Sequence, residues 1–423
     1  MNKAILLLLS YANKLLLITF FLVLLFLSFV HFNIFGLKNQ IYQKYPNLEL
    51  RHYLFNKYPH FLKEISNDYS VKFLPKTQFV DLNFEKKKLI FLPKNEKSFF
   101  KTFYIENIKD KLWIIDVGGN FFEILVEDFM NTKKEENFNP KIISSNLIAK
   151  KVLGTLVYDE KIFISYYTQQ DQCKKLKVSF ANINNDFLNF KNLFATEECG
   201  KNDIYGGKMQ FFKHNKSKGI LLTTADIVRD DLNNKAQEDD SIFGKILFIN
   251  FETKKYIVYS KGHRNAAGLY SKNDLIISTE HGPKAGDEIN KIVFGKNYGW
   301  PIASYGEKYK QDENAKPTYH KNHFSLGFEE PLFSFIPALG ISEIIKIPYS
   351  FTNFWSNNFF VSSLWGQSLH RIKFDESFSK VIFNEKIFVG ERIRDLKYNK
   401  NMNAIILALE EDGELGILKK KID

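Results

Sequence analysis

Residues Gly262 to Pro301 read GHRNAAGLYSKNDLIISTEHGPKAGDEINKIVFGKNYGWP, and their layout indicates the type of fold. A strand-like run, Asp274 to Thr279, follows a polar Gly-His-Arg-Asn turn and precedes a loop rich in glycine, proline and acids. This arrangement is typical of a strand whose connections carry the polar groups, because a rigid sheet can aim such groups at a ligand.

The chemistry of these residues allows two interpretations of the polar groups. Arg264 and Asn265 offer forked donors for carboxylates or carbonyls. The Gly282-Pro283 pair offers backbone carbonyls, and Asp287 and Glu288 offer hard oxygen ligands of the kind that calcium takes. This set suits an anionic cofactor neutralised by a divalent ion. The alternative is a tight inter-strand loop with solvated acids.

The same two-strand unit recurs along the chain, and most of the units are spaced like the blades of a β-propeller. Six such units are present: Lys111–Asp116 with Phe121–Val126, Lys161–Ser165 with Leu176–Phe180, Gly219–Thr223 with Gly244–Phe248, Asp274–Ser278 with Glu288–Ile292, Asn358–Ser362 with Ser368–Ile372, and Ala404–Ala408 with Glu414–Leu418.

The spacing predicts how the ring is interrupted and closed. The longer gap between the fourth and fifth units contains Gly295–Ser334, which we expect to be an insertion over the channel mouth. Closure requires a strand from before the first unit, either Val71–Phe73 or Phe79–Phe84, to join the last sheet and remove its open edge. The sequence therefore predicts an all-β, six-bladed β-propeller over residues 71–423.

Composition agrees with this class. The chain has 423 residues, of which 44% are hydrophobic and 25% charged, as in ordinary globular proteins. The 42 Phe and 20 Tyr residues favour a β-rich core, because aromatic side chains suit half-buried pleated surfaces. The net charge of +11 is spread over predicted turns rather than gathered in an aromatic-flanked groove, so nucleic acid is not an expected partner.

The N-terminus contains an apolar run between Lys14 and Lys38, with no charged residue unless His31 is protonated. At about 1.5 Å per helical residue, this run can cross a bilayer of roughly 30 Å. We therefore expect a single-pass membrane anchor over residues 1–37 and a membrane-proximal linker over 38–70. A cleaved signal peptide is the alternative, although residues 33–36 make a poor cleavage site. Lysines on both sides leave the orientation undecided.

Two cysteines, Cys173 and Cys199, flank one hairpin-like segment. They form either a disulfide of an oxidising compartment or two unpaired thiols, because spacing alone does not place their α-carbons within reach. The sequence has no CxxC motif and no Cys/His cluster, so a zinc site is not indicated.

Three motifs carry a family resemblance: GHRN at 262–265, EHGPKAGDEIN at 280–290 and NYGWP at 297–301. In this order and spacing they resemble the glucose/sorbosone dehydrogenase family, the soluble and periplasmic aldose sugar dehydrogenases that use pyrroloquinoline quinone (PQQ) and calcium. The resemblance covers roughly Gly154 to Leu418. It implies a six-bladed propeller that oxidises a sugar C1 hydroxyl to the lactone. It also implies a propeller on the periplasmic side of an inner membrane, with an electron acceptor still to be identified.

Residue by residue, the resemblance implies a cofactor site. Arg264 and Asn265 match the residues that hold the quinone, and the carbonyls of Gly282 and Pro283 match those that bind its calcium. A second, structural calcium is implied at two further positions, Glu288 and the Tyr298 carbonyl.

The segment Glu391–Asp395 resembles the family's R-x-R-D turn, so Arg392 and Arg394 are expected to reach the cofactor carboxylates. The alternative is an exposed strand edge with charge pairs.

Two positions depart from the family pattern. Ile204 stands where the family has its catalytic histidine, and Trp365 stands at about the position of a cofactor-contacting lysine. Because sugar oxidation needs a base, a substitute is required, and the candidates are Asp203, His281 and Asp226. Trp365 offers a flat face that can stack on the cofactor or a sugar ring.

Three functions remain open on these residues. The first is a membrane-anchored PQQ-dependent sugar dehydrogenase with an altered base, which passes electrons to a membrane acceptor. The second is a non-catalytic propeller that binds a ligand or acts as a scaffold. The third is a hydrolase such as a lactonase, with calcium held in the central channel by acids that include Asp203, Asp226 and Glu280.

Overall fold

The computed structural model describes residues 17–26, 77, 80–92, 100–131, 140–200, 203–226, 235–307 and 319–421. The chain separates into two units, Met1–Ser70 and Val71–Asp423. In the first unit, residues 17–26 form a helix. The rest of the predicted anchor, the predicted linker and the candidate strand Val71–Phe73 lie outside the described residues. Among the described helices, none is both long enough and apolar enough to cross a membrane.

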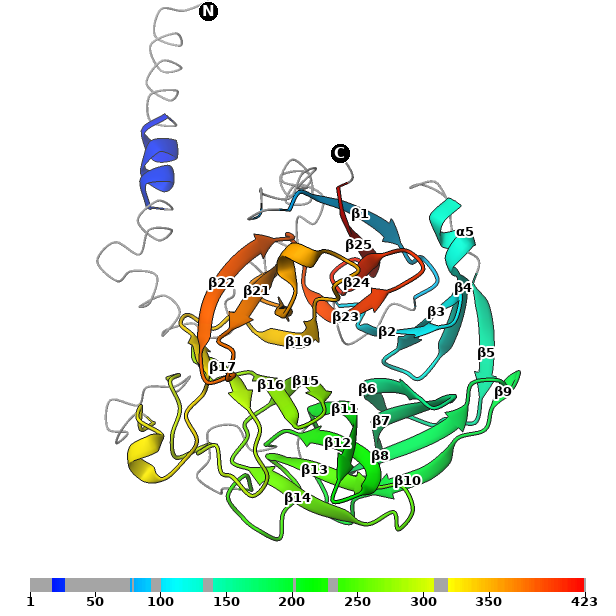
Figure 1. The fold of residues 1–423 in the computed structure, drawn as a ribbon. Helices are drawn as coiled ribbons and strands as arrows, with labels where there is room; N and C mark the ends of the chain where they lie inside the picture. Colours follow the sequence, from blue (N-terminus) through cyan, green and yellow to red (C-terminus); the bar gives the residue numbers. More distant parts are fainter. Residues whose placement is uncertain are drawn as a thin grey trace, which may run out of the picture. The chain divides into compact units, whose positions relative to one another are not determined.

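Six sheets surround a central axis in the second unit, as the blades of a propeller (Figure 1). Blade 1 contains β2 (Phe103–Ile108), β3 (Lys111–Asp116), β4 (Phe121–Leu125), β5 (Lys141–Ser145) and a short parallel strand β9 (Phe187–Leu188), with helix α5 (Val126–Asn131) after β4. Blade 2 contains β6 (Lys151–Tyr158), β7 (Lys161–Gln170), β8 (Cys173–Asn182) and β10 (Lys191–Ala195). Blade 3 contains β11 (Gly206–His214), β12 (Ser217–Thr224), β13 (Lys245–Asn250) and β14 (Tyr256–Lys261).

The other three blades follow in chain order. Blade 4 contains β15 (Ala266–Lys272), β16 (Leu275–Glu280), β17 (Asp287–Lys291) and β18 (Phe333–Phe335). Blade 5 contains β19 (Ile341–Lys346), β20 (Asn358–Ser363), β21 (Ser368–Phe374) and β22 (Val381–Phe388). Blade 6 contains β23 (Ile393–Asn399), β24 (Ala404–Leu409), β25 (Glu414–Lys420) and β1 (Leu82–Lys88). Two short 3-10 helices, η2 (Phe324–Leu326) and η3 (Asn353–Trp355), lie in connections.

The predicted closure of the ring is confirmed, but the closing strand occupies residues slightly further along the chain. β1 pairs antiparallel with β25 from Leu82 opposite Lys420 to Lys88 opposite Glu414. The segment Phe79–Phe84 was therefore the correct choice, but the strand begins at Leu82 and continues further along the chain. The pairing covers the edge that the last sheet would otherwise expose.

All six predicted units are confirmed, and each forms the second and third strands of a blade. The second strands are largely apolar because both of their faces are buried between neighbouring blades, whereas third strands such as β17 (Asp287–Lys291) also carry polar residues. In the second strand β24, for example, every residue from Ala404 to Leu409 is buried. One hydrophobic cluster fills each of the six junctions between blades, so the core is a ring of six wedges.

The innermost strands were not predicted as strands, and most of them are irregular at their start. The register shifts near the beginning of β6, β11, β15, β19 and β23. Such a bulge re-aims side chains and interrupts the alternation of a strand. Glycine allows a close approach here, because a Cβ on Gly154 would lie 2.4 Å from the Gly207 carbonyl oxygen of the next blade.

The predicted insertion lies between the third and fourth strands of blade 4. It is shorter than expected, because β18 (Phe333–Phe335), which pairs with β17, includes its last predicted residues. Of the two states left open for the cysteines, the disulfide is the one observed: Cys173 and Cys199 are bonded at 2.03 Å.

A hydrogen bond near the channel links each blade to the next. Side-chain hydroxyls donate to a carbonyl of the following blade at four junctions: Ser165 to Gly207, Thr223 to Ala266, Thr279 to Ser342 and Ser342 to Ile393. At the other two junctions, Ile105 N–H donates to the Asp395 carboxylate and Val152 N–H donates to Val117 O. Each of these bonds fixes an inner strand against the neighbouring blade.

We predict that Thr223→Val lowers the free energy of unfolding by about 1 to 3 kcal/mol, although the shapes of the two side chains match. The buried Thr223 hydroxyl donates to Ala266 O over 2.9 Å and accepts from Lys208 N–H over 3.0 Å, so its loss leaves two buried backbone groups unpaired. Urea unfolding of the purified protein measures the change. Thr168→Val, on the less buried end of β7, is the control and is expected to change stability by less than about 0.5 kcal/mol. Equal effects of the two substitutions would contradict the role assigned to Thr223.

Candidate functional site

The predicted site residues gather at one end of the propeller. In each blade the start of the inner strand pairs with the end of the second strand; Ala266 lies opposite Glu280 and Gly206 opposite Thr224. The interblade hydrogen bonds align these ends around the ring. We call this end the mouth. The turns before β11, β15 and β23 and the loops after β12, β16 and β20 all lie there, and they carry the candidates Asp203, Ile204, Asp226, Arg264, Asn265, His281, Trp365, Arg392 and Arg394.

The Gly-His-Arg-Asn turn divides between core and mouth. His263 is fully buried, where its Nδ1 bonds Glu280 at 2.7 Å and its Nε2 bonds Ser260 at 2.8 Å. Arg264 is half-buried, donates to the His281 carbonyl over 3.0 Å and lies 5.3 Å from the Trp300 ring. The turn therefore presents Arg264 toward the mouth while His263 anchors it.

The Gly282-Pro283 loop is tightly folded around Asp287. One Asp287 oxygen accepts from Gly282 N–H at 3.0 Å, and the other accepts from Leu339 N–H and Ile341 N–H. A Cβ on Gly282 would lie 2.2 Å from the Gly286 carbonyl oxygen, so only glycine fits. Asp287 was expected among the oxygen ligands, but its carboxylate binds the loop backbone instead.

Two carboxylates face each other beneath this loop. Glu280 and Glu288 are directly opposite in the β16–β17 pair and border a small cavity together with Tyr298, Trp300 and other residues. Burial raises the pKa of Glu288 to about 8, and the charge of Glu280 adds to the shift. Burial opposes ionisation of Glu280 as well, yet its pKa is lowered because His263, Ser278 and Asn290 bond it. A cation in this cavity would relieve the repulsion.

Buried polar atoms without a hydrogen-bond partner concentrate in the same region. Among the described residues, eight buried side-chain atoms have none. Six of them belong to blade 4 and its insertion: Asn265 Oδ1, His281 Nε2, Asn290 Oδ1, both ring nitrogens of His323, and Ser334 Oγ. Because such atoms are costly when unpaired, this part of the molecule has polar groups to which water, an ion or a polar ligand could bond.

Arg392 and Arg394 share one buried carboxylate, Glu410, at the end of β24. Arg392 Nε donates to it at 2.9 Å, and Arg394 donates through Nε at 2.8 Å and Nη2 at 3.2 Å. Thr102 of blade 1 donates to it at 2.9 Å. Charge pairs, one of the two interpretations left open, are therefore present. They also hold both guanidinium groups in fixed positions at the start of β23.

The position of the family histidine is enclosed. Ile204 is 0% exposed and packs in the hydrophobic cluster between blades 2 and 3. Its neighbour Asp203 lies 2.5 Å from Lys174 Nζ, which together with Tyr167 lowers the pKa of Asp203 despite partial burial. Asp226 accepts from Trp300 Nε1 at 2.6 Å. Two of the three candidate bases are thus engaged by other side chains.

His281 and Trp365 differ sharply in their surroundings. Burial lowers the pKa of His281 to about 4, so its ring is neutral at pH 7. Its Nδ1 lies 3.3 Å from Asn265 Nδ2. Trp365, at the end of β20, is 56% exposed. More than half of the surface of this residue is therefore open to solvent at the mouth.

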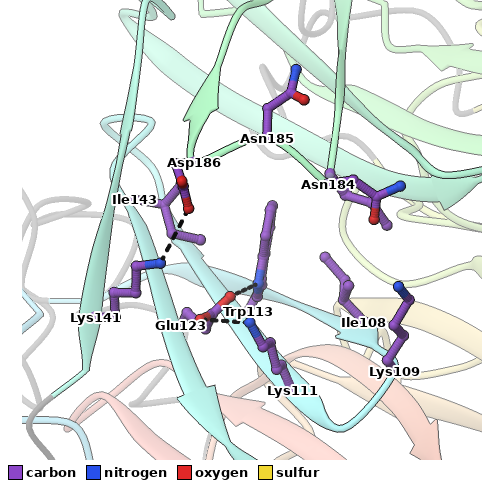
Figure 2. Close-up of a pocket in the computed structure, with 11 residues that line it drawn as sticks. Ile108, Lys109, Lys111, Trp113, Glu123, Lys141, Ile143, Asn184, Asn185 and Asp186 are labelled. Atoms are coloured by element: carbon purple, nitrogen blue, oxygen red, sulfur yellow. Dashed lines mark hydrogen bonds and ion pairs between the residues drawn. The ribbon is translucent and has the colours of Figure 1, made fainter.

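A larger cavity of about 200 Å³ lies at the opposite end of the strands, between blades 1 and 2. Figure 2 shows Trp113 at its centre, with Lys111 and the Trp113 indole both bonded to Glu123, and Lys141 facing Asp186. None of the predicted site residues borders it. Most of the charged side chains around this cavity pair with one another, so their role is explained by the stability of the fold.

Sequence reasoning missed Glu410 and Trp300. The sequence signal that could have found Glu410 is its place at the end of an apolar second strand. Glu280 lies at the corresponding end of β16. Among the described residues, no cluster of three or more His, Cys, Asp or Glu is arranged to hold a metal. The expected calcium ligands are mainly carbonyls, which such a cluster would not include.

The six-bladed architecture and the gathering of the motifs at the mouth agree with a β-propeller of the sugar dehydrogenase class. The family model "Glucose / Sorbosone dehydrogenase" matches residues 155–418, which is more than half of the chain, and the protein belongs to this family. Aldose sugar dehydrogenase YliI of Escherichia coli is 26% identical over 279 residues, 60% of this chain and 72% of that protein. An uncharacterised Synechocystis protein is 29% identical over 201 residues; the match spans 44% of this chain and 48% of that protein.

Solved structures share the fold. The apo aldose sugar dehydrogenase of E. coli has a TM-score of 0.61 at 18% identity, over 80% of this chain and 99% of that one. The PQQ-bound aldose sugar dehydrogenase of Streptomyces coelicolor has a TM-score of 0.53 at 16% identity, over 80% and 99%. At such identities the likeness establishes the six-bladed fold alone.

We predict that Glu410→Gln lowers the free energy of unfolding at neutral pH and makes that free energy less sensitive to acid. Burial would raise the pKa of Glu410, but Arg394 and Arg392 hold it below its usual value. The carboxylate therefore stabilises the fold above about pH 4.5, and this contribution is lost as the pH falls through the lowered pKa. Urea unfolding at pH 7, 5 and 3 should show the difference between wild type and variant shrinking toward pH 3. Glu376→Gln, at an exposed site, is the control; a difference that stays constant with pH would contradict the assignment.

Proposed function

We propose that this protein is a PQQ- and calcium-dependent sugar dehydrogenase that oxidises an aldose at C1 to the lactone. The observation that carries the proposal is the concentration of unpaired buried polar atoms around the Gly282-Pro283 loop, next to guanidinium groups at the family's cofactor positions. A hydrolytic, lactonase-like function has less support, because Asp203, Asp226 and Glu280 each bond a protein side chain.

The side chains at the mouth fit an anionic, flat cofactor. Arg264, Arg392 and Arg394 supply forked donors for carboxylates. Asn265 adds an amide whose Oδ1 has no partner within the described structure, and the exposed Trp365 adds a face for stacking. PQQ, when bound, supplies the quinone that accepts hydride from the sugar.

Two divalent-cation sites are part of the proposal. The carbonyls of Gly282 and Pro283 would hold calcium against the cofactor, since the loop is fixed by Asp287. Glu288 and the Tyr298 carbonyl would hold a second calcium, and the buried, opposed Glu280 and Glu288 fit a cation because burial and the Glu280 charge raise the pKa of Glu288.

The proton acceptor is assigned to His281. Asp203 and Asp226 are bonded to Lys174 and Trp300, whereas Nε2 of His281 is buried with no partner among the described groups. The competing proposal is a non-catalytic propeller that binds the cofactor or another ligand without turnover. The observation in its favour is Ile204, which is enclosed in the core at the position of the family histidine.

Calorimetric titration of the purified full-length protein with PQQ, with and without calcium, tests the proposal together with an aldose and dye-reduction assay. We expect calcium-dependent binding and dye reduction. His281→Gln should retain binding and lose activity by about 10² to 10⁴, the usual effect of removing a general base. Binding without dye reduction in the wild type would support the non-catalytic propeller, and no binding would refute the dehydrogenase.

Membrane attachment is a further proposal. The apolar run that includes the described helix 17–26 would anchor the protein in an inner membrane, with the propeller on the periplasmic side and electrons passing to a membrane acceptor. We predict that an alkaline phosphatase fused to the C-terminus is active and sediments with membranes. A C-terminal reporter that works only in the cytoplasm would contradict this orientation, and a fully released fusion would favour a cleaved signal peptide.

A further inference from the structure

Lys151 is a half-buried cation at the mouth that lies outside the set of predicted site residues. It is the first residue of β6, the inner strand of blade 2, where it pairs with Tyr167 of β7. Its Nζ lies 5.0 Å from the centroid of the Tyr205 ring, in the turn that leads into blade 3. The ammonium group therefore lies near Tyr205, the residue that follows Ile204, the position at which the resemblance expects a histidine.

The charge of Lys151 interacts with groups across the mouth. Burial lowers the pKa of Lys151, the positive charge of Arg394 in blade 6 lowers it further, and Asp203 and Glu410 oppose the shift. Lys151 and Arg394 thus form a pair of like charges contributed by different blades. Such a pair costs free energy unless an anion lies between them.

The acids near Lys151 are already paired. Asp203 lies 2.5 Å from Lys174 Nζ, and Glu410 binds both Arg392 and Arg394. Lys151 itself forms no ion pair with any residue that the structure describes. Burial penalises the charged form of Lys151, as its lowered pKa indicates, and among the described residues no carboxylate offsets that cost in an ion pair. A carboxylate from a ligand would supply this missing partner.

We propose that Lys151 binds a carboxylate of the ligand at the mouth, and so supplies from blade 2 the cation that blade 5 lacks at Trp365. This inference rests on the proposed function, in which the ligand is PQQ, a flat quinone that carries carboxylates. Lys151, Arg392 and Arg394 would then bind acidic groups, while Trp365 offers an aromatic face in place of a charge.

Titration of the full-length protein with PQQ in the presence of calcium tests this role through affinity rather than turnover. We expect Lys151→Met to weaken binding about tenfold or more, since a charge-assisted hydrogen bond is lost, and Lys151→Arg to keep most of the affinity. The matched control is Lys161→Met. Lys161 is also a half-buried lysine at the first position of a strand in blade 2, but β7 begins at the end opposite the mouth.

The outcomes separate this inference from the proposed function. Wild-type binding that Lys151→Met leaves unchanged would overturn the role of Lys151 while the cofactor proposal stands. Equal weakening by Lys151→Met and Lys161→Met would reveal a non-specific charge effect and would also overturn it. Absence of PQQ binding by the wild type would overturn both. Thermal unfolding without ligand checks that Lys151→Met and Lys161→Met both fold, so that a loss of affinity in either variant reports on binding.

Discussion

The antiparallel pairing of β1 with β25 is the contact on which the rest of the propeller depends. The two strands come from opposite ends of the propeller sequence, so their pairing converts a row of sheets into a ring. Ring closure places blade 6 beside blade 1, where Asp395 accepts from Ile105 N–H and Glu410 accepts from Thr102. Since Glu410 also binds Arg392 and Arg394, the guanidinium groups of the mouth are oriented across the junction that closes the ring.

The second strand of each blade could be predicted because it is largely apolar and buried on both faces, as in β24, where every residue from Ala404 to Leu409 is buried. The third strands are less uniform; β17 reads Asp-Glu-Ile-Asn-Lys, and the recurring unit rather than an apolar run indicated it. The inner strands could not be predicted in the same way. They begin with bulges and carry the polar groups of the channel, as in β11, where Gly206 and Gly207 precede the buried Lys208. Lys208 bonds Glu343 and Asp395 from two other blades, so its place in the interior depends on contacts distant in sequence.

The same limit applies to individual site residues. Asp287 has the chemistry of a calcium ligand, and nothing in its local sequence indicates that Leu339 and Ile341 would donate backbone N–H groups to it. The motifs indicated where the candidate site residues lie better than they indicated which partner each residue binds. The Arg-Asn turn, the Gly-Pro loop and the R-x-R-D turn do gather at one mouth, yet the partner of each side chain depends on the packing between blades.

Ligand binding and proton transfer rest on different parts of this mouth. The groups suited to binding lie on turns of blades 4 and 6, where they face the opening. Position 204 instead lies within a hydrophobic cluster. The packing there is tight: a Cβ added to Gly200, which follows the disulfide-bonded Cys199, would come within 3.1 Å of the Ile204 side chain. An imidazole at this position would lose water without gaining a hydrogen-bond partner from the apolar cluster, which would disfavour its charged form and weaken it as a base. Position 204 therefore contributes packing alone, and the candidates for proton transfer lie outside this cluster; among them, His281 has a buried Nε2 without a hydrogen-bond partner among the described residues.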